Sequence, residues 1–324
     1  MRSAIPDAEI TWVVNDALCD VVRLCPGISR IIPFPRKNLL SLSKISAFAR
    51  ELRKESYDVA IDFQGLLRSG VMTMLCRAGK KVGFSSAREG ATMFYGSAFH
   101  IPDMHTHAVD KNIQLARFAL DIPSEIPVPP PSVSIPQESN AAMDEIAPPA
   151  ANSPILAVCF SSRWHSKNWS PQFISESIDC ASEQVPGLRV FLTGSKDDKE
   201  LGDRIAALCR DPHPVNLAGK TDIAGLAALL SRSSAMFTVD SGPMHLAAAI
   251  GIPCVAMFGS TDDVLTGPYG PAGLHTVIHT KCRRAPCFRH ECPLARNCAD
   301  GCSPQEAASA IRSATCWLLP VAEK

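Results

Sequence analysis

Residues 237–249 read Phe-Thr-Val-Asp-Ser-Gly-Pro-Met-His-Leu-Ala-Ala-Ala, which predicts a strand that runs directly into a helix. The apolar run ends at Asp240 and Gly242 permits a tight turn. Pro243 suits the first turn of a helix, where its missing N–H would have no partner in any case. A strand followed at once by a helix is the unit from which parallel sheets are built. The stretch therefore predicts an α/β fold.

Apolar runs of this kind recur along the chain and alternate with helical patterns. Those that predict strands are residues 10–14, 59–63, 81–84, 155–160, 190–193, 235–239 and 254–258. Prolines crowd residues 123–154, which suits a linker interrupted by a short helix over about residues 138–146. We therefore expect two doubly wound, Rossmann-like domains that face a ligand cleft, residues 1–150 and 151–324.

The composition narrows the classes of function. The 324 residues are 46% apolar and 20% charged, which suits folded domains, and 32 basic residues balance 32 acidic ones. A chain with no net charge has no overall positive electrostatic potential to attract nucleic acid, so the composition does not favour a nucleic-acid-binding protein. No apolar run reaches the roughly 18 residues of a membrane-spanning helix, and the first residues carry no secretory signal, so we expect a cytoplasmic protein. Cysteines such as Cys76 and Cys254 lie in apolar runs, which favours reduced thiols.

The predicted helix start after Asp240 suits a phosphate group. Backbone N–H groups without helical partners and the positive end of the helix dipole favour an anion there, and His245 can donate a further hydrogen bond to a diphosphate. An alternative stays open for these residues taken alone. Asp240 or Ser241 would then only cap the helix, and His245 would pack in the turn.

The same run, continued through residues 258–262 and 266–270, resembles the signature of glycosyltransferase family 9. Ser161 and Ser162, followed by residues 167–170, resemble the segment with which that family holds the phosphates of its donor. A second group of segments resembles the heptosyltransferase I branch of the family, namely residues 62–69, 83–89, 94–95 and 105–112. The resemblance covers nearly the whole chain.

The resemblance implies a GT-B fold and inverting transfer of a sugar from a nucleotide-diphosphate donor, typically ADP-heptose, without a cofactor or an essential metal. The donor-binding residues that it implies are Ser161, Ser162, Lys167, Lys196, Asp240, Ser241, Gly242 and His245. Lys196 departs from the family, because some members carry a glutamate there that contacts the ribose of the donor. The choice of ADP over another nucleotide rests on the resemblance alone.

For the acceptor, the resemblance implies binding by Gln64, Arg68, Arg88 and Lys111. Their positive charges suit an acidic acceptor such as the Kdo-bearing inner core of lipopolysaccharide, carried on lipid A. Each charge can equally be an ordinary surface charge. A lipid-linked acceptor also implies peripheral contact with the inner face of the inner membrane.

The sequence departs from the family at its start. The family's catalytic carboxylate lies in a Gly-Asp loop after the first strand, whereas residues 3–7 look like the end of a helix leading into residues 10–14. We therefore assign no catalytic residue and expect an N-terminally truncated first domain. Two hypotheses follow. The first is an active heptosyltransferase whose natural start lies upstream or whose base is an unrecognised residue, and the second is a noncatalytic nucleotide-sugar-binding relative. A hexosamine 2-epimerase would account for the cleft but not for residues 240–249.

A cysteine cluster near the C-terminus invites a zinc interpretation. It consists of Cys282, Cys287, Cys292, Cys298 and Cys302, with His290 among them. No Cys-x-x-Cys pair occurs in it, and reduced thiols packed under nearby arginines would give the same pattern. We expect no metal site.

Overall fold

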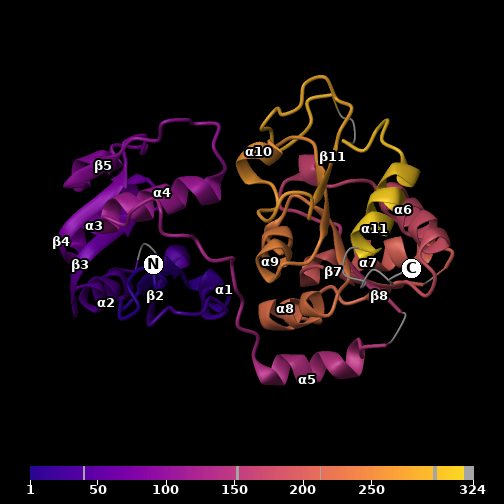
Figure 1. Ribbon diagram of the computed structural model, residues 1–324, viewed down its shortest axis with the longest axis horizontal. Coiled ribbons are helices and arrows are strands. Elements are labelled where there is room, and N and C mark those ends of the chain that lie inside the picture. Colours follow the sequence, from indigo (N-terminus) through magenta and orange to yellow (C-terminus); the bar gives the residue numbers. More distant parts are fainter. Residues whose placement is uncertain (39–40, 151–152, 212, 295–297, 317–324) are drawn as a thin grey trace. The chain divides into compact units, whose positions relative to one another are not determined.

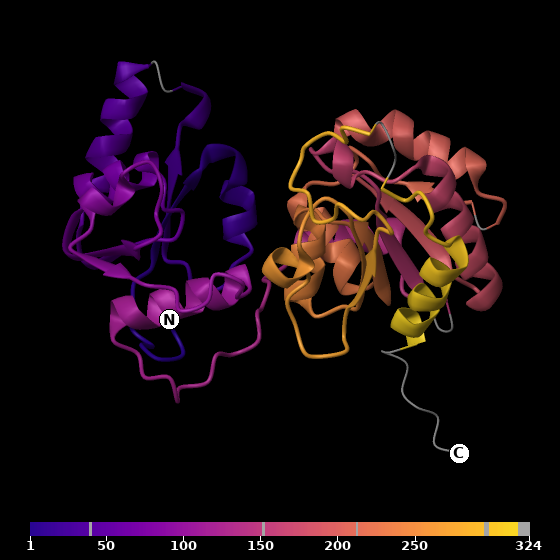
Figure 2. The ribbon, with the colours of Figure 1, turned by 90° about the horizontal axis from the view of Figure 1, so that it is seen from above.

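The computed structural model describes residues 1–38, 41–150, 153–211, 213–294 and 298–316, and the chain forms two compact units, Met1–Pro129 and Pro130–Lys324 (Figure 1). The division lies earlier than residue 150, because helix α5 (Gln137–Ile146) packs against helix α8 (Ile223–Ser231) of the second unit. The extended segment before α5 can be followed in Figure 2. In the described residues no helix is long and apolar enough to cross a membrane.

The second unit contains a six-stranded parallel sheet of order β11-β10-β9-β6-β7-β8. Its strands are β6 (Ile155–Cys159), β7 (Arg189–Thr193), β8 (Val215–Asn216), β9 (Ala235–Val239), β10 (Cys254–Phe258) and β11 (Thr276–His279). The strand order reverses between β6 and β9, which are hydrogen-bonded neighbours. Doubly wound sheets bind ligands at such a switch point, beyond the carboxyl ends of the strands.

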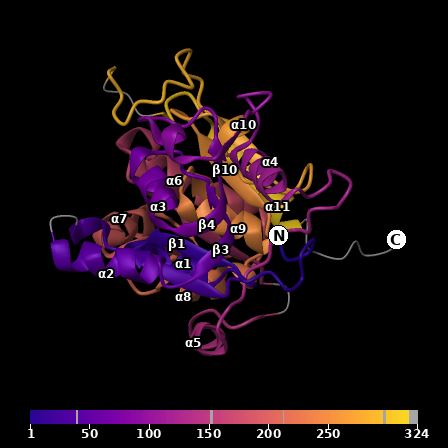
Figure 3. The same cartoon turned by 90° about the vertical axis from the view of Figure 1, so that its left-hand side faces the viewer.

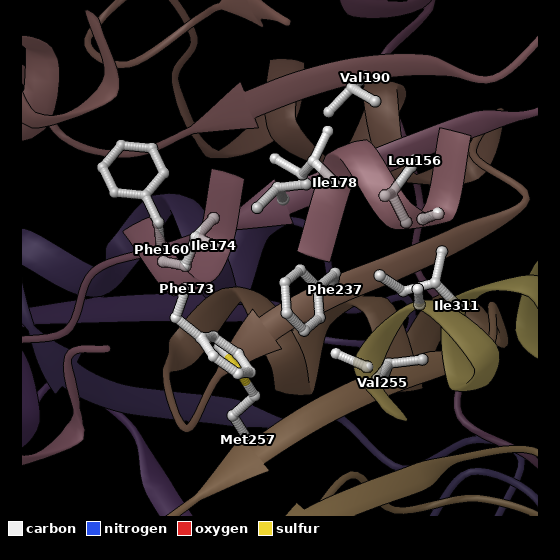
Figure 4. Packing of buried hydrophobic residues seen from close by; sticks show 14 of the residues in the cluster. Leu156, Phe160, Phe173, Ile174, Ile178, Val190, Phe237, Val255, Met257 and Ile311 are labelled. Carbon is white, nitrogen blue, oxygen red and sulfur yellow. The ribbon is translucent and has the colours of Figure 1, made fainter. Parts of the chain in front are cut away.

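Helices cover both faces of this sheet, so its central strands are buried along their whole length. Besides α5 and α8 they are α6 (Pro171–Gln184), α7 (Lys199–Leu208), α9 (Gly242–Ile250), α10 (Asp263–Thr266) and α11 (Pro304–Cys316), with the short 3-10 helices η4 (His165–Lys167) and η5 (Lys196–Asp198). Figure 4 shows the larger core cluster, in which Ile178 of α6 and Ile311 of α11 pack with Phe237 of β9. A second cluster on the opposite face joins Met143 of α5 to α8 and α9.

The described residues of the first unit, which face the viewer in Figure 3, form two small parallel sheets. One sheet pairs β1 (Thr11–Asn15) with β2 (Arg30–Phe34), and the other has the order β3 (Ser56–Asp62), β4 (Arg77–Phe84), β5 (Ser97–Phe99). The helices are α1 (Cys19–Arg23), α2 (Leu42–Leu52), α3 (Leu67–Leu75) and α4 (Ala108–Leu120), with 3-10 helices η1 (Asp16–Leu18), η2 (Arg36–Asn38) and η3 (Ala91–Phe94). The rings of Trp12 and Phe63 stack with centroids 6.0 Å apart and link the two sheets.

Residues 3–7 form turns, so the prediction that they end a helix is wrong. One helical hydrogen bond is present, from Ile5 N–H to the Met1 carbonyl at 2.9 Å. Pro6 disfavours helical backbone at Ile5 and has no N–H of its own, and a single turn gains too little to offset its conformational entropy.

Candidate functional site

Three neighbouring strands bring the sequence motifs of the second unit together. β6 pairs with β9 and β9 with β10, all parallel, so their carboxyl ends lie at one edge of the sheet. The segment from Ser161 to Lys167 follows β6, the Asp240–His245 run follows β9, and Thr261 follows β10. This edge includes the point at which the strand order reverses.

Asp240 connects the three segments. Its side chain is only 6% exposed, and Oδ2 accepts hydrogen bonds from Lys167 Nζ at 2.6 Å and from Thr261 Oγ1 at 2.6 Å. A buried carboxylate is tolerated only when it is paired and hydrogen-bonded, and both conditions hold here. Asp240 therefore fixes the turn after β6 and the turn after β10 to the end of β9.

Lys167 is a positioned cation and not a freely solvated surface lysine. Its side chain is 15% exposed, and the ammonium lies 4.6 Å from the centre of the Trp164 ring. Trp164 in turn stacks on His290, with ring centroids 3.8 Å apart. The carboxylate and the aromatic face together hold the positive charge at the carboxyl edge of the sheet.

Helix α9 begins at the same edge without a side-chain cap. Ser241 is the N-cap residue, but its side chain makes no capping hydrogen bond, and its Oγ lies 3.5 Å from Cys159 Sγ. The capping alternative therefore does not describe Asp240 or Ser241. A Cβ added to Gly242 would meet no atom within 4 Å, so the helix start faces open space. His245 is exposed in the first turn.

The remaining predicted donor residues flank this edge. Ser161 and Ser162 are half-buried, and Ser162 N–H donates to Asn168 Oδ1 at 2.6 Å. Lys196 lies in η5 after β7, one strand further from Asp240 than Lys167. Its Cα would be 2.8 Å from a Cβ at Gly219, whose φ of +73° also favours glycine. Lys196 is thus at the same edge but outside the Asp240 network.

The segment that carries the cysteine cluster, which begins at Cys282, is attached to the turn that carries Lys167. We call it the cysteine-rich segment. Ser166 is buried, its N–H donates to the His290 carbonyl at 3.0 Å, and its Oγ lies 2.5 Å from the Arg289 carbonyl oxygen and 2.9 Å from Ser260 Oγ. Phe288 N–H donates to the Ser260 carbonyl at 2.7 Å. The segment therefore braces both the η4 turn and the end of β10.

Four cysteines of this segment line one cavity of about 270 Å³, and Ser166, Gly259 and Ser260 line it with them. The four are Cys282, Cys287, Cys292 and Cys298. Burial first, and then the neighbouring thiols, raise the pKa of Cys298 to about 11. All thirteen cysteines are free thiols, and among the described residues no three His, Cys, Asp or Glu side chains are arranged to hold a metal ion.

In the first unit, Asp62 organises the loop that carries the predicted acceptor residues. It is buried at the end of β3, and its Oδ1 accepts from the N–H groups of Gln64 at 2.9 Å and Gly65 at 3.1 Å. Tyr95 Oη donates to Asp62 Oδ2 at 2.7 Å, and burial together with this carboxylate raises the pKa of Tyr95. Arg88 N–H donates to the Gly65 carbonyl at 2.8 Å. The structure thus joins the loops of Gln64 and Arg88.

Arg68 lies in the first turn of α3, directly after this loop, with its guanidinium 5.7 Å from the centre of the Phe34 ring. Lys111 lies in α4, and its ammonium donates to the Met104 carbonyl at 2.6 Å. Lys111 therefore contacts the turn before its own helix, whereas Arg68 directly follows the Gln64 loop in the chain. The hydrogen bond between Tyr95 and Asp62 was not predicted, although both residues lie in segments that carry the family resemblance.

Comparisons with known proteins identify this arrangement of motifs. The family model described as "Glycosyltransferase family 9 (heptosyltransferase)" matches residues 45–297. The chain belongs to glycosyltransferase family 9. This glycosyltransferase is 30% identical over 299 residues to lipopolysaccharide heptosyltransferase 1 of Pseudomonas aeruginosa, a match that covers 89% of the chain and 80% of the relative. It is 28% identical over 279 residues to lipopolysaccharide heptosyltransferase 1 of Escherichia coli K12, covering 83% and 84%.

Solved structures confirm the fold class of this family 9 glycosyltransferase, GT-B with two Rossmann-like units. E. coli heptosyltransferase WaaC with ADP is similar with a TM-score of 0.69 and 25% identity, covering 85% of each chain. E. coli ADP-heptose lipopolysaccharide heptosyltransferase II is similar in fold, with a TM-score of 0.72 and 19% identity, covering 97% of this chain and 91% of that one.

Proposed function

We propose that this glycosyltransferase transfers a heptose from ADP-heptose to the Kdo-bearing inner core of lipopolysaccharide, with inversion at the anomeric carbon. Membership of family 9 supports heptosyl transfer, and the relatives named above are lipopolysaccharide heptosyltransferases. The observation that carries the proposal is the Asp240 network. It holds the cation of Lys167 beside the uncapped start of α9, where the strand order reverses.

The network suits a departing diphosphate. In the proposed reaction an acceptor hydroxyl attacks the anomeric carbon, the bond from that carbon to the diphosphate breaks, and ADP leaves with the bonding electrons. The growing negative charge would meet the ammonium of Lys167 and the N–H groups of α9, both fixed before the reaction starts. A general base must remove the hydroxyl proton, and we assign that role to no residue.

The other donor contacts follow from the same edge of the sheet. Ser161, Ser162 and Ser241 offer hydroxyls near the diphosphate, and His245 can donate from the first turn of α9. Asp240 would act on the donor through Lys167, because its Oδ2 already accepts from that ammonium and from Thr261.

On the acceptor side, Gln64, Arg68 and Arg88 are proposed to bind carboxylates of the inner core, since guanidinium groups recognise carboxylates through paired hydrogen bonds. Asp62 would hold the Gln64 turn in place through its two backbone hydrogen bonds. Lys111, which lies on another element, is proposed to add positive charge for the same acidic acceptor. The lipid A part of such an acceptor places the reaction at the inner face of the inner membrane, which the protein would contact peripherally from the cytoplasm.

The test is an assay of heptose transfer from ADP-heptose to a Kdo-lipid A acceptor. Transfer is measured by the release of ADP and by mass spectrometry of the product. Replacing Lys167 with Met should lower kcat/KM about 100-fold or more, because a preorganised donor of positive charge is lost. The matched control is Lys199→Met, which removes an exposed lysine paired with Asp203 at 2.6 Å on α7 and should leave transfer unchanged.

Two results would contradict the proposal. Full activity in the Lys167→Met variant would show that the Asp240 network has no part in the transfer reaction. Absence of transfer by the unaltered chain, with ADP-heptose binding retained in calorimetry and lost on Asp240→Ala, would instead indicate a noncatalytic nucleotide-sugar-binding protein.

A further inference from the structure

The loop that follows β11 concentrates positive charge. Between residues 281 and 294 the basic residues are Lys281, Arg283, Arg284 and Arg289, and the acidic residue is Glu291. The chain as a whole has 32 basic and 32 acidic residues, so this excess is a local feature. We call residues 281–294 the basic loop.

The four cations of the basic loop are available to a partner. All four residues are exposed, and within the described part of the chain none of them forms an ion pair. Some exposed basic side chains elsewhere are neutralised, as Lys199 is by Asp203 at 2.6 Å. Unpaired cations gathered on one loop favour an anionic surface.

The basic loop also exposes two large apolar side chains. Phe288 is 53% exposed and Leu294 is 44% exposed. Single exposed apolar residues are common, but Phe288 has a φ of +52°, a conformation that bulky residues rarely adopt. Its N–H donates to the Ser260 carbonyl at 2.7 Å, and this bond holds the strained backbone in place. The fold therefore keeps a phenylalanine ring at the surface despite a cost in backbone energy.

The position of the loop fits an interaction surface beside the donor site. Figure 1 shows the loop that directly follows β11 projecting beyond α10 and the other helices of its unit. The same segment is fixed to the turn of Lys167 by the hydrogen bond from Ser166 N–H to the His290 carbonyl at 3.0 Å. A partner bound to the loop would thus lie near the candidate donor site.

We propose that the basic loop docks the protein on an anionic lipid bilayer. Phe288 and Leu294 enter the interfacial region, while Lys281, Arg283, Arg284 and Arg289 contact headgroup phosphates. Aromatic and apolar side chains flanked by basic ones are the combination that such a surface binds. A soluble phosphate compound would use the charges but would leave the two apolar side chains in water. Docking itself does not depend on the proposed transfer reaction.

The experiment is co-sedimentation of the full chain with vesicles. Vesicles of phosphatidylglycerol mixed with phosphatidylcholine should bind the protein, vesicles of phosphatidylcholine alone should not, and binding should weaken with salt. The double variant Arg283→Ala/Arg284→Ala should lower the partition coefficient roughly 30-fold, because each arginine near an anionic surface contributes about 1 kcal/mol to binding. Phe288→Ser should lower it about tenfold, and Leu294→Ser should act in the same direction.

The matched control is Arg204→Ala/Arg312→Ala, which removes two exposed arginines from α7 and α11 of the same unit and should leave partition unchanged. Thermal melting of each variant checks that it is folded. Failure to bind anionic vesicles, or equal binding by the loop variants and the unaltered chain, would overturn the proposal. So would binding that Phe288→Ser leaves intact and inorganic phosphate competes away, since the loop would then be a site for soluble phosphate.

Discussion

Asp240 and Lys167 show how two side chains 73 residues apart come to share one function. Each is almost buried, and removing an isolated charge from water costs several kcal/mol. The ion pair and the hydroxyl of Thr261 offset that cost. The sequence predicted both residues as donor ligands, but it could not predict that they pair, because the register between β6 and β9 has no local signal.

The pair predicts an asymmetric response to mutation. Lys167→Met leaves the carboxylate of Asp240 buried, with Thr261 as its remaining side-chain partner among the described residues, and should lower the free energy of unfolding by about 3 kcal/mol. Asp240→Asn should cost less, about 1 to 2 kcal/mol, because Lys167 keeps the Trp164 ring and more exposure to water. The double variant should be much less destabilised than the sum of the two. Urea denaturation measures this cycle, and strictly additive losses would show that the two charges are not coupled.

At the level of elements, strands that are buried on both faces were predicted best. The predicted bounds of β9 and β10 agree with the structure, because a continuous apolar run between turn residues has a clear beginning and end. β2 was missed because it contains Pro33, and β5 and β8 were missed because they have only three and two residues. Polar residues obscured the first half of β4, which begins at Arg77. Edge and half-exposed strands depend on pairing partners that a sequence pattern does not contain.

The cysteine-rich segment should make the stability of the protein depend on pH in alkaline solution. The pKa of Cys298 is raised from 9.0 to about 11, so the folded state holds the thiol proton more tightly than the unfolded chain. The corresponding stabilisation is complete below pH 9 and is lost as the pH rises through about 11. We expect the free energy of unfolding to fall over this interval, and to fall less steeply in Cys298→Ala. Denaturant titrations at several pH values measure the two slopes.

Cys316→Ala, which removes an exposed cysteine at the end of α11, is the control and should keep the slope of the unaltered chain. Equal slopes in all three proteins would show that the cavity does not shift the titration of Cys298. The sequence drew attention to this cluster, but whether the thiols face one cavity depends on how the loop packs against Ser166 and Ser260.

For the whole molecule, the sequence predicted two α/β domains but not their boundary. Prolines mark residues 123–154 as a connection, yet α5 within it belongs to the second unit. Met143 is 2% exposed in the core formed with α8, and Arg232 forms an ion pair with Asp144 at 2.6 Å. An amphipathic helix shows that it has a buried face, but its composition does not identify the domain against which that face packs.

The two units differ in the size of their cores, which predicts that they unfold separately. The second unit has the two largest buried clusters and a six-stranded sheet, whereas the first unit has smaller clusters and sheets of two and three strands. Small sheets with little buried apolar surface are weakly stable. We therefore expect hydrogen exchange measured in increasing urea to release the amides of β3 and β4 before those of β6 and β9.

Core substitutions assign the two transitions. Leu115→Ala, at a fully buried position of α4, should lower the stability of the first transition by about 2 to 5 kcal/mol and leave the second unchanged. Ile178→Ala, fully buried in α6, should act on the second transition by a similar amount. If each substitution shifted the exchange of both units equally, the units would unfold as one cooperative body. Stability would then depend on contacts between them and not on the size of each core.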